Sequence, residues 1–309
     1  MASPNTHILT SDMLIIKELS PLFFVGDAIS HITSLFEQVG ITSARLDAEV
    51  LISHILQTDR TGLYLKTRTP LTNDAWRGII ALSEKRACGI PIAYLLGKKE
   101  FYSLDFFVDD SVLIPRPETE ILVQETSQIL ELLPRNKEKP LLALEVGAGS
   151  GAISVALACN IDNLKIIATD ISSSALAVAR KNINHHRLSD TISFLCGNLY
   201  DPIRDLNQFD CIISNPPYVS TKEMSSLPTE VKNEPHVALY GGDEGLDVIL
   251  PLVLNASRYL KPEGYVLFEI GATQNRKIKK MLSTSITLEL LYIREDYSGV
   301  PRVVVAKRK

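Results

Sequence analysis

The sequence is poor in cysteine and tryptophan and has no large excess of either charge. Its 309 residues include four cysteines and one tryptophan, and the formal net charge is −4. This mildly acidic balance argues against a protein that grips a nucleic-acid backbone along many phosphates, so we expect no stable nucleic-acid partner. No segment offers about eighteen uninterrupted apolar residues, and the N-terminus lacks the pattern of a secretion signal. We therefore expect a cytoplasmic monomer with no membrane partner.

The cysteines lack the paired spacing that metal sites use. They are Cys88, Cys159, Cys196 and Cys211. Three of them lie in apolar segments, which predicts buried free thiols in a reducing compartment. No metal site is expected.

The tetrapeptide Asn215-Pro216-Pro217-Tyr218 follows an apolar run, residues 209–214, that is typical of a buried strand. The strand must end there, because each proline lacks the N–H that a sheet ladder needs. Asn215 is then left at the carboxyl end of a strand, where open α/β sheets bind ligands. The Asn215 side-chain oxygen and the Pro216 carbonyl can each accept one hydrogen of a planar –NH2 group, and Tyr218 can pack against that group. The alternative is a plain proline turn.

A glycine-rich turn lies upstream, between the apolar run 141–146 and a small-residue helix expected over 152–159. Its residues are Gly147, Ala148, Gly149, Ser150 and Gly151. The first two glycines permit a tight turn and close backbone approach to a ligand, and Gly151 lets the helix pack on the strand. The spacing also fits the dinucleotide fingerprint, so the turn alone does not decide between ligands.

Asp170 ends the next predicted strand, residues 165–170. It stands about twenty residues past the glycines, where a carboxylate can accept hydrogen bonds from both hydroxyls of a ribose. The alternative is an N-cap for a helix from Ser172 onward.

The order of glycine turn, acid and Asn-Pro-Pro-Tyr resembles the class I methyltransferases that use S-adenosylmethionine and act on planar amino groups. The stretches 89–102 and 113–120, and Asn233-Glu234-Pro235, look like the signature of the HemK/PrmC family. These are the release factor glutamine N5-methyltransferases, and the similarity runs from about Asp27 to the C-terminus. The resemblance implies S-adenosylmethionine as cofactor. As partner it implies a class-1 peptide chain release factor, methylated on the glutamine of its Gly-Gly-Gln motif.

The resemblance also implies roles for further residues. Asn198 stands where the family usually has Asp and can bond the adenine amino group, and Leu199 beside it would cover the adenine face. Glu145 stands where the family often shows Asp, with a structural bond to loop amides as the alternative. The predicted catalytic residues are Asn215, Pro216 and Tyr218; Pro217 and Arg116 join them in substrate binding. The predicted cofactor-binding residues are Gly147 to Gly151, Asp170, Asn198, Leu199, Asn215 and Phe101.

Patterning divides the chain into parts. Residues 1–20 are expected to be a disordered extension, and the three-to-four spacing of apolar residues over 21–97 predicts a helical substrate-recognition domain. Residues 98–120 predict a β-hairpin linker with its turn at Asp109-Asp110. Strands and helices alternate over 121–309, which predicts an α/β, Rossmann-like methyltransferase domain with a mostly parallel seven-stranded sheet covered on both faces.

Positioning is expected to dominate the chemistry, because an amide nitrogen is a poor nucleophile and must be held in line with the methyl group. No histidine or carboxylate is expected as an essential base, because the methylated nitrogen is acidic enough to release its proton.

Two other functions fit parts of the pattern. One is a DNA or RNA exocyclic amino-methyltransferase with a flipped base. The other is a non-catalytic nucleotide-binding or scaffold protein.

Overall fold

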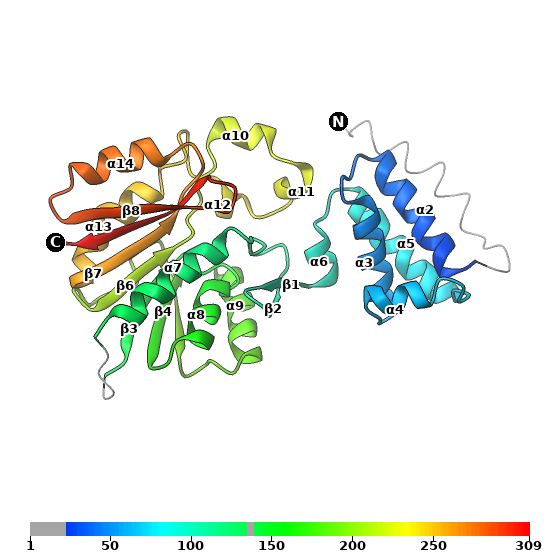
Figure 1. Cartoon of the computed structure of the whole chain (residues 1–309), viewed down its shortest axis with the longest axis horizontal. Coiled ribbons are helices and arrows are strands. Elements are labelled where there is room, and N and C mark those ends of the chain that lie inside the picture. Colours follow the sequence, from blue (N-terminus) through cyan, green and yellow to red (C-terminus); the bar gives the residue numbers. More distant parts are fainter. Residues whose placement is uncertain (1–22, 135–138) are drawn as a thin grey trace. The chain divides into compact units, whose positions relative to one another are not determined.

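The computed structural model describes residues 23–134 and 139–309, so the extension expected over residues 1–20 lies outside the described residues. The chain divides into two compact units, Met1–Leu96 and Gly97–Lys309. Figure 1 shows the helices of the first unit and the sheet and helices of the second. Each unit has its own apolar core.

The N-terminal unit is helical, as its apolar spacing predicts. Its core is formed by buried residues of four helices, among them Ile32, Phe36, Leu51, Ile52 and Trp76. Burying side chains of this size contributes about 1.5–3 kcal/mol each, which is what holds so small a bundle together. The helices are α2 (Val25–Gln38), α3 (Ala44–Ile55), α4 (Arg60–Leu65), α5 (Asn73–Ala87) and α6 (Ile92–Leu96).

A β-hairpin opens the C-terminal unit, formed by β1 (Lys98–Phe101) and β2 (Leu104–Phe107). The turn predicted at Asp109-Asp110 is wrong: the hairpin turns at Tyr102 and Ser103, whose φ angles are 52° and 59°. Two-residue hairpin turns with positive φ favour Asn and Gly, so Tyr-Ser gives no signal of one. Asp109 instead bends the chain beyond the hairpin, where its side chain accepts a hydrogen bond from Ser111 N at 2.9 Å.

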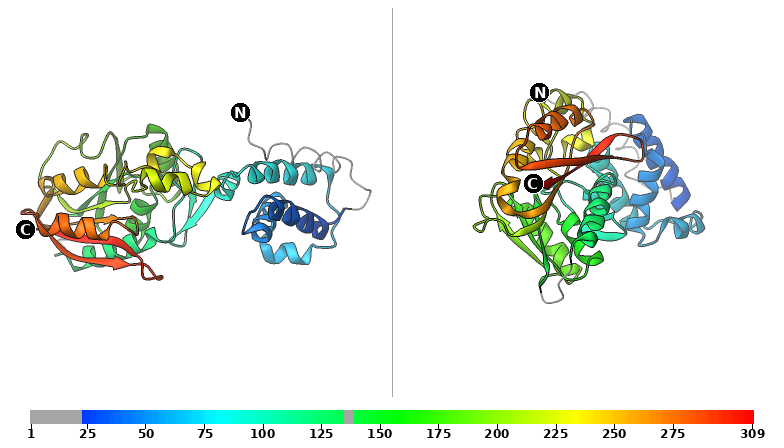
Figure 2. Two further views of the ribbon diagram at one scale, coloured as in Figure 1. Left: turned by 90° about the horizontal axis from the view of Figure 1, so that it is seen from above. Right: turned by 60° about the vertical axis from the view of Figure 1, so that its left-hand side comes forward.

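The large sheet has seven strands in the order β5-β4-β3-β6-β7-β9-β8. The first five strands in this order are parallel, and β9 pairs antiparallel with both β7 and β8. The predicted, mostly parallel seven-stranded sheet is confirmed. In Figure 2 the C-terminal strands β8 and β9 lie together at one edge of it. The strands are β3 (Leu141–Val146), β4 (Leu164–Asp170), β5 (Ile192–Cys196), β6 (Phe209–Ser214), β7 (Leu260–Glu269), β8 (Leu288–Glu295) and β9 (Pro301–Arg308).

Helices cover both faces of this sheet (Figure 1). On one face, α7 (Thr119–Leu132), α8 (Ala152–Asn160) and α9 (Ser173–His185) contribute to one apolar core. On the other, α13 (Ile249–Tyr259) and α14 (Asn275–Ser283) contribute to a second. Strands β3 and β6 are apolar along most of their length because they are covered on both sides. Three short helices connect β6 to α13: α10 (Thr221–Ser226), α11 (Thr229–Lys232) and α12 (His236–Leu239).

The cysteines are all free, but the prediction that three of them are buried is wrong. Only Cys211, in the central strand β6, is buried, and the other three thiols are exposed. Cys159 lies in the last turn of α8, and Cys196 is the last residue of the edge strand β5. An apolar neighbourhood in sequence does not bury a side chain at the end of an element or at the edge of a sheet.

Candidate active site

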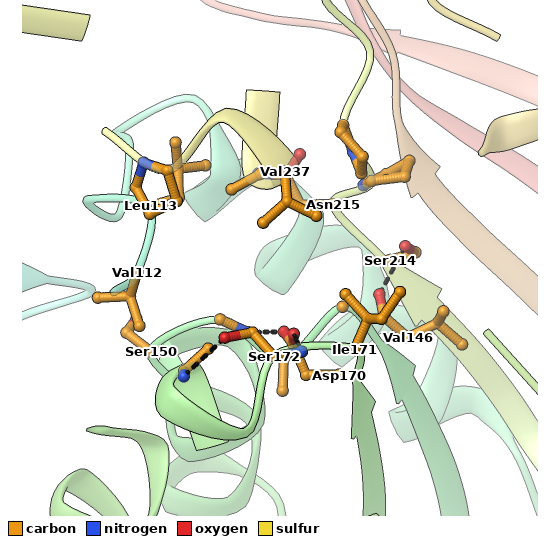
Figure 3. Close-up of a pocket in the computed structure, with 18 of the residues that line it drawn as sticks. Val112, Leu113, Val146, Ser150, Asp170, Ile171, Ser172, Ser214, Asn215 and Val237 are labelled. Carbon is orange, nitrogen blue, oxygen red and sulfur yellow. Dashed lines mark hydrogen bonds between the residues drawn. The ribbon is translucent and has the colours of Figure 1, made fainter. Parts of the chain in front are cut away.

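A cavity of about 370 Å³ opens at the carboxyl ends of β3, β4 and β6. It lies where the strand order reverses between β3 and β6, the position at which open α/β sheets bind ligands. Figure 3 shows Asp170 at the end of β4, Ser172 just before α9, Asn215 from the turn after β6, and Val237 of α12 around this space. All of its lining residues belong to the C-terminal unit.

The glycine turn forms one wall of the cavity. Gly147, Gly149 and Gly151 have φ angles of 81°, 52° and 78°, a left-handed conformation that side chains disfavour. A Cβ on Gly149 would meet no atom within 4 Å, so the backbone there faces open space that a ligand can approach. A Cβ on Gly151 would contact Ala179 of α9 at 3.3 Å, so this glycine allows close approach of a neighbouring helix, whereas the sequence predicted packing on the strand.

Asp170 lies beside the glycine turn and holds it. One carboxylate oxygen accepts from Gly149 N and the other from Ser172 N, each at 2.8 Å. Burial raises the pKa of Asp170, and these amide bonds lower it. The N-cap of α9 is Ser172, whose side chain accepts from Ala175 N at 3.1 Å. Asp170 is therefore not the cap of that helix, and lone pairs remain on its oxygens for ribose hydroxyls.

Asn198 and Leu199 border the same cavity in the segment after β5. Leu199 has a φ angle of 44°, and its carbonyl accepts a hydrogen bond from Thr169 Oγ1 at 2.9 Å. The Thr169 carbonyl also accepts the amides of Gly147 and Ala148. Thr169 thus joins the expected adenine segment to the glycine turn, a role that its sequence position gave no reason to predict.

Asn182 of α9 is a second residue that sequence reasoning missed. It is completely buried and joins the hairpin to the glycine turn. Its side-chain nitrogen donates to the carbonyls of Phe107 and Ser150 at 3.0 and 2.8 Å, and its oxygen accepts from Phe107 N at 2.7 Å. Phe101, on the other strand of the hairpin, is buried and lines the cavity.

Glu145 is the penultimate residue of strand β3, is buried and also lines the cavity. One of its oxygens accepts from both the amide and the hydroxyl of Ser154, while Oε1 has no hydrogen-bond partner among the described residues. Burial raises the pKa of this carboxyl to about 8. The expected bond from loop amides is instead a bond from the first turn of α8.

Asn215 lies in the cavity wall beside Gly147, and its side-chain amide is hydrogen-bonded to α7. Its Nδ2 donates to Thr119 Oγ1 at 3.1 Å, and Thr119 donates in turn to Glu269 Oε2 at 2.8 Å. No described group donates to Asn215 Oδ1 or to the Pro216 carbonyl, and both residues line the cavity. Two acceptor oxygens of one turn are thus free of protein donors.

Tyr218 is not brought into the cavity lining, although Pro216 and Pro217 are. Its hydroxyl donates to Glu269 Oε1 at 2.9 Å, and its carbonyl accepts from Gln274 Nε2 at 3.0 Å. In this structure Tyr218 therefore stabilises the turn through these two hydrogen bonds and does not face the cavity. The Glu269 carboxylate thereby joins α7 to the turn after β6.

Arg116 lines the cavity and is paired with Glu234, whose carboxylate also accepts from Ile114 N at 3.0 Å. Glu234 is buried, so this pair fixes the segment before α7 to the loop before α12. Two of the sequence signatures, 113–120 and 233–235, thus meet at one salt bridge. His236, next to the second signature, lines the cavity as well and was not predicted to do so.

The groups that line the cavity suit one kind of ligand. Among residues 23–134 and 139–309, no group of three or more His, Cys, Asp or Glu side chains could hold a metal ion. Open glycine amides, a carboxylate at the end of β4 and an apolar segment after β5 suit a nucleoside with a charged tail. They fit S-adenosylmethionine.

Comparison with known proteins agrees with this geometry. The PrmC N-terminal domain family matches residues 27–97, and the methyltransferase small domain family matches residues 122–234. The release factor glutamine methyltransferase of Geobacter sulfurreducens is 37% identical over 269 residues, which cover 86% of this chain and 90% of that protein. That of Koribacter versatilis is 37% identical over 282 residues, 91% of this chain and 96% of the relative. The chain belongs to the release factor glutamine methyltransferase family.

Membership confirms the family that the sequence motifs resemble, and it implies S-adenosylmethionine as the methyl donor of this methyltransferase. A bifunctional methyltransferase of Rickettsia felis is 32% identical over 308 residues, 92% of this chain but 58% of its own length. The hMettl16 catalytic domain, solved in complex with MAT2A 3'UTR hairpin 6, shares the fold with a TM-score of 0.53. At 15% identity, over 74% of this chain and 81% of that one, the likeness extends to the fold alone. No described helix of the methyltransferase is long and apolar enough to cross a membrane.

Proposed function

We propose that this enzyme transfers a methyl group from S-adenosylmethionine to the side-chain amide nitrogen, N5, of the glutamine in the Gly-Gly-Gln motif of class-1 peptide chain release factors. One observation carries the proposal. Asn215 Oδ1 and the Pro216 carbonyl are acceptors without protein donors on one rigid turn, facing the cavity that the glycine turn bounds. A primary amide presents two hydrogens in one plane, which two such acceptors match.

The chain's own residues act by positioning. S-adenosylmethionine, when bound, supplies the electrophilic methyl group. Holding both amide hydrogens directs the nitrogen lone pair, normally delocalised into the carbonyl, toward that methyl group. As positive charge develops on the nitrogen, it meets the oxygens of Asn215 and Pro216, which need not reorganise. The extra proton then leaves to water, so no carboxylate or histidine of the site acts as an essential base.

The other roles proposed for site residues follow the same geometry. Asp170 receives the ribose hydroxyls, Asn198 and Leu199 receive the adenine, and Phe101 packs against the cofactor; all of them line the cavity. Arg116, held by Glu234 at the cavity, contacts the acceptor loop. Tyr218 supports the turn that holds the acceptor amide.

We also propose that residues 21–97 form the substrate-recognition domain, joined by the hairpin linker 98–120 to a catalytic domain over 121–309. A single glutamine side chain offers too few contacts to be chosen among all glutamines of a cell, so selection needs a larger protein surface. The helical unit, with its own core, is the part of the chain available for that task.

Incubation of the full chain with labelled S-adenosylmethionine and an intact release factor, a short Gly-Gly-Gln peptide, tRNA or DNA tests the proposal. We expect label on the loop glutamine of the intact factor, none on a factor whose loop glutamine is replaced by alanine, and a much higher KM for the peptide. Equal KM values for factor and peptide would contradict the recognition role of residues 21–97. Label on nucleic acid and none on the factor would make the enzyme an exocyclic amino-methyltransferase.

A further inference from the structure

Glu269 is a buried carboxylate that receives one hydroxyl on each of its oxygens. Thr119 donates to Oε2 at 2.8 Å and Tyr218 donates to Oε1 at 2.9 Å. The side chain stands at the end of β7 and is 1% exposed. A buried carboxylate with both oxygens bonded has little freedom to rotate, so it offers Thr119 an acceptor at a fixed place.

This arrangement determines what Thr119 can do for Asn215. A hydroxyl carries one hydrogen, and Thr119 gives its hydrogen to Glu269. Only lone pairs then remain on Thr119 Oγ1 for the Asn215 side chain, 3.1 Å away. An amide oxygen there would face another acceptor, so the NH2 group must take that position. The Asn215 oxygen is thereby left on the side without a protein donor.

The direction of this amide matters because its two ends have opposite hydrogen-bonding character. With the oxygen toward the cavity, Asn215 accepts a hydrogen from the acceptor amide. With the amide reversed, an NH2 group would meet an NH2 group, and the site would keep its shape but lose its acceptor. Nothing in the shape of an amide prevents the reversal, because its oxygen and nitrogen ends are nearly isosteric.

We propose that Thr119 and Glu269 are positioning residues for methyl transfer, which set the direction of the Asn215 amide so that its oxygen faces the acceptor. This inference rests on the proposed function for the identity of the acceptor. It adds two residues, 96 and 54 positions from Asn215 in sequence, to the machinery of the acceptor turn. Neither touches the reacting atoms; both act through Asn215.

The hydrogen bonds from Asn215 to Thr119 and from Thr119 to Glu269 form what we call the relay. Thr119→Val tests the relay, because valine keeps the shape of threonine and removes the hydroxyl. Thr119→Ser keeps the hydroxyl. Thr126→Val is the matched control: Thr126 is also a buried threonine of α7, but it donates only to Leu122 O within the helix, at 2.7 Å. For each variant, kcat and KM for an intact release factor, S-adenosylmethionine affinity by calorimetry, and hydrogen exchange of the Asn215 side-chain NH2 by NMR are measured.

Thr119→Val should lower kcat about ten- to a hundredfold, as misplacement of a reacting group does, while S-adenosylmethionine affinity stays within about twofold. Exchange of the Asn215 NH2 should accelerate in this variant alone. Thr119→Ser should restore kcat to within a few-fold, and Thr126→Val should match the wild type. Thr119→Val turning over like Thr126→Val, or showing unchanged NH2 exchange, would overturn the inference.

Glu269→Gln gives a second test that leaves Thr119 in place. Glutamine fills the same volume but adds a donor, so the Thr119 hydrogen is no longer directed to one acceptor. We expect reduced kcat with retained S-adenosylmethionine affinity, and wild-type kcat would again overturn the relay. If the wild-type chain methylates no release factor, the proposed function fails, but NH2 exchange in wild type and Thr119→Val still decides whether the relay exists.

Discussion

Asp170 accepts a hydrogen bond from the backbone amide of Gly149 at 2.8 Å. The acid expected to receive the ribose therefore also fixes the glycine turn against which the rest of the cofactor would lie. The carboxylate has a structural role, and each of its oxygens keeps lone pairs after one amide bond for the binding role that we propose.

Asp170→Ala should lower S-adenosylmethionine affinity about ten- to a hundredfold, because charge-assisted hydrogen bonds contribute about 1.5–3 kcal/mol. Asp170→Asn should lose less, since its oxygen can still accept one of these bonds. Calorimetry with S-adenosylmethionine measures both. Asp162→Ala, an exposed acid in the loop before β4, is the control and should bind like the wild type. Unchanged affinity in Asp170→Ala would leave only the structural role.

Glu145 predicts a pH dependence of stability. Its pKa is raised from the ordinary 4.5 to about 8 in the folded chain, so between these values the folded state holds a proton that the unfolded state has lost. Stability must fall as pH rises through this window, by up to ~1.4 kcal/mol per pH unit. Glu145→Gln does not titrate and can still accept from Ser154. The free energy of unfolding of this variant relative to wild type, measured in denaturant, should grow from pH 5 to pH 8. A difference independent of pH would contradict a raised pKa.

Glu269 predicts a pH dependence of activity. Burial raises its pKa, Thr119, Tyr218 and Arg302 lower it, and Glu118 raises it. A protonated Glu269 can donate a hydrogen bond, so Thr119 is no longer held as the donor and the orientation of the Asn215 amide is no longer fixed. Because the pKa of Glu269 is raised, this loss should occur at a higher pH than the protonation of an ordinary carboxyl. Tyr218→Phe removes one bond to the carboxylate and should shift the acid limb of the kcat profile to higher pH.

Tyr292→Phe is the control for that shift, because Tyr292 also donates to a glutamate, Glu125, at 2.9 Å, but outside the cavity. Its profile should match the wild type. An acid limb at the same pH in all three proteins would show that Glu269 does not govern it. Tyr218→Ala, which also removes the ring that supports the turn, should be slower than Tyr218→Phe at every pH.

The site residues that could be predicted from the sequence are those that a local pattern of a few residues identifies. Positive φ at Gly147 and Gly149 favours glycine, and Asn215 is placed by the prolines after it, which end β6. Strands β3 and β6 have the predicted bounds because they are short apolar runs between clear breaks. Pro262 and Gly264 are typical of a turn, yet strand β7 (Leu260–Glu269) passes through both with a shift of register.

The buried polar side chains that hydrogen-bond to the site residues could not be predicted from such local patterns. The Thr119–Glu269 bond joins residues 150 positions apart, because α7 packs against β7. Parallel pairing of β6 with β7 aligns Ser214 with Phe268 and so brings Asn215 beside Glu269. Asn182 likewise reaches the hairpin across 75 positions. Local patterns predict strands and turns, but which buried polar side chains meet depends on sheet register, which no short motif encodes.

The rate of methyl transfer to an intact release factor by Asn215→Ala tests the central claim most directly, with the modified loop glutamine identified by mass spectrometry. Losing a hydrogen bond made to the charge that develops in the transition state should cut the rate about a hundredfold or more, while calorimetry shows nearly unchanged S-adenosylmethionine affinity. A variant that binds S-adenosylmethionine and methylates the factor at close to the wild-type rate would contradict the account.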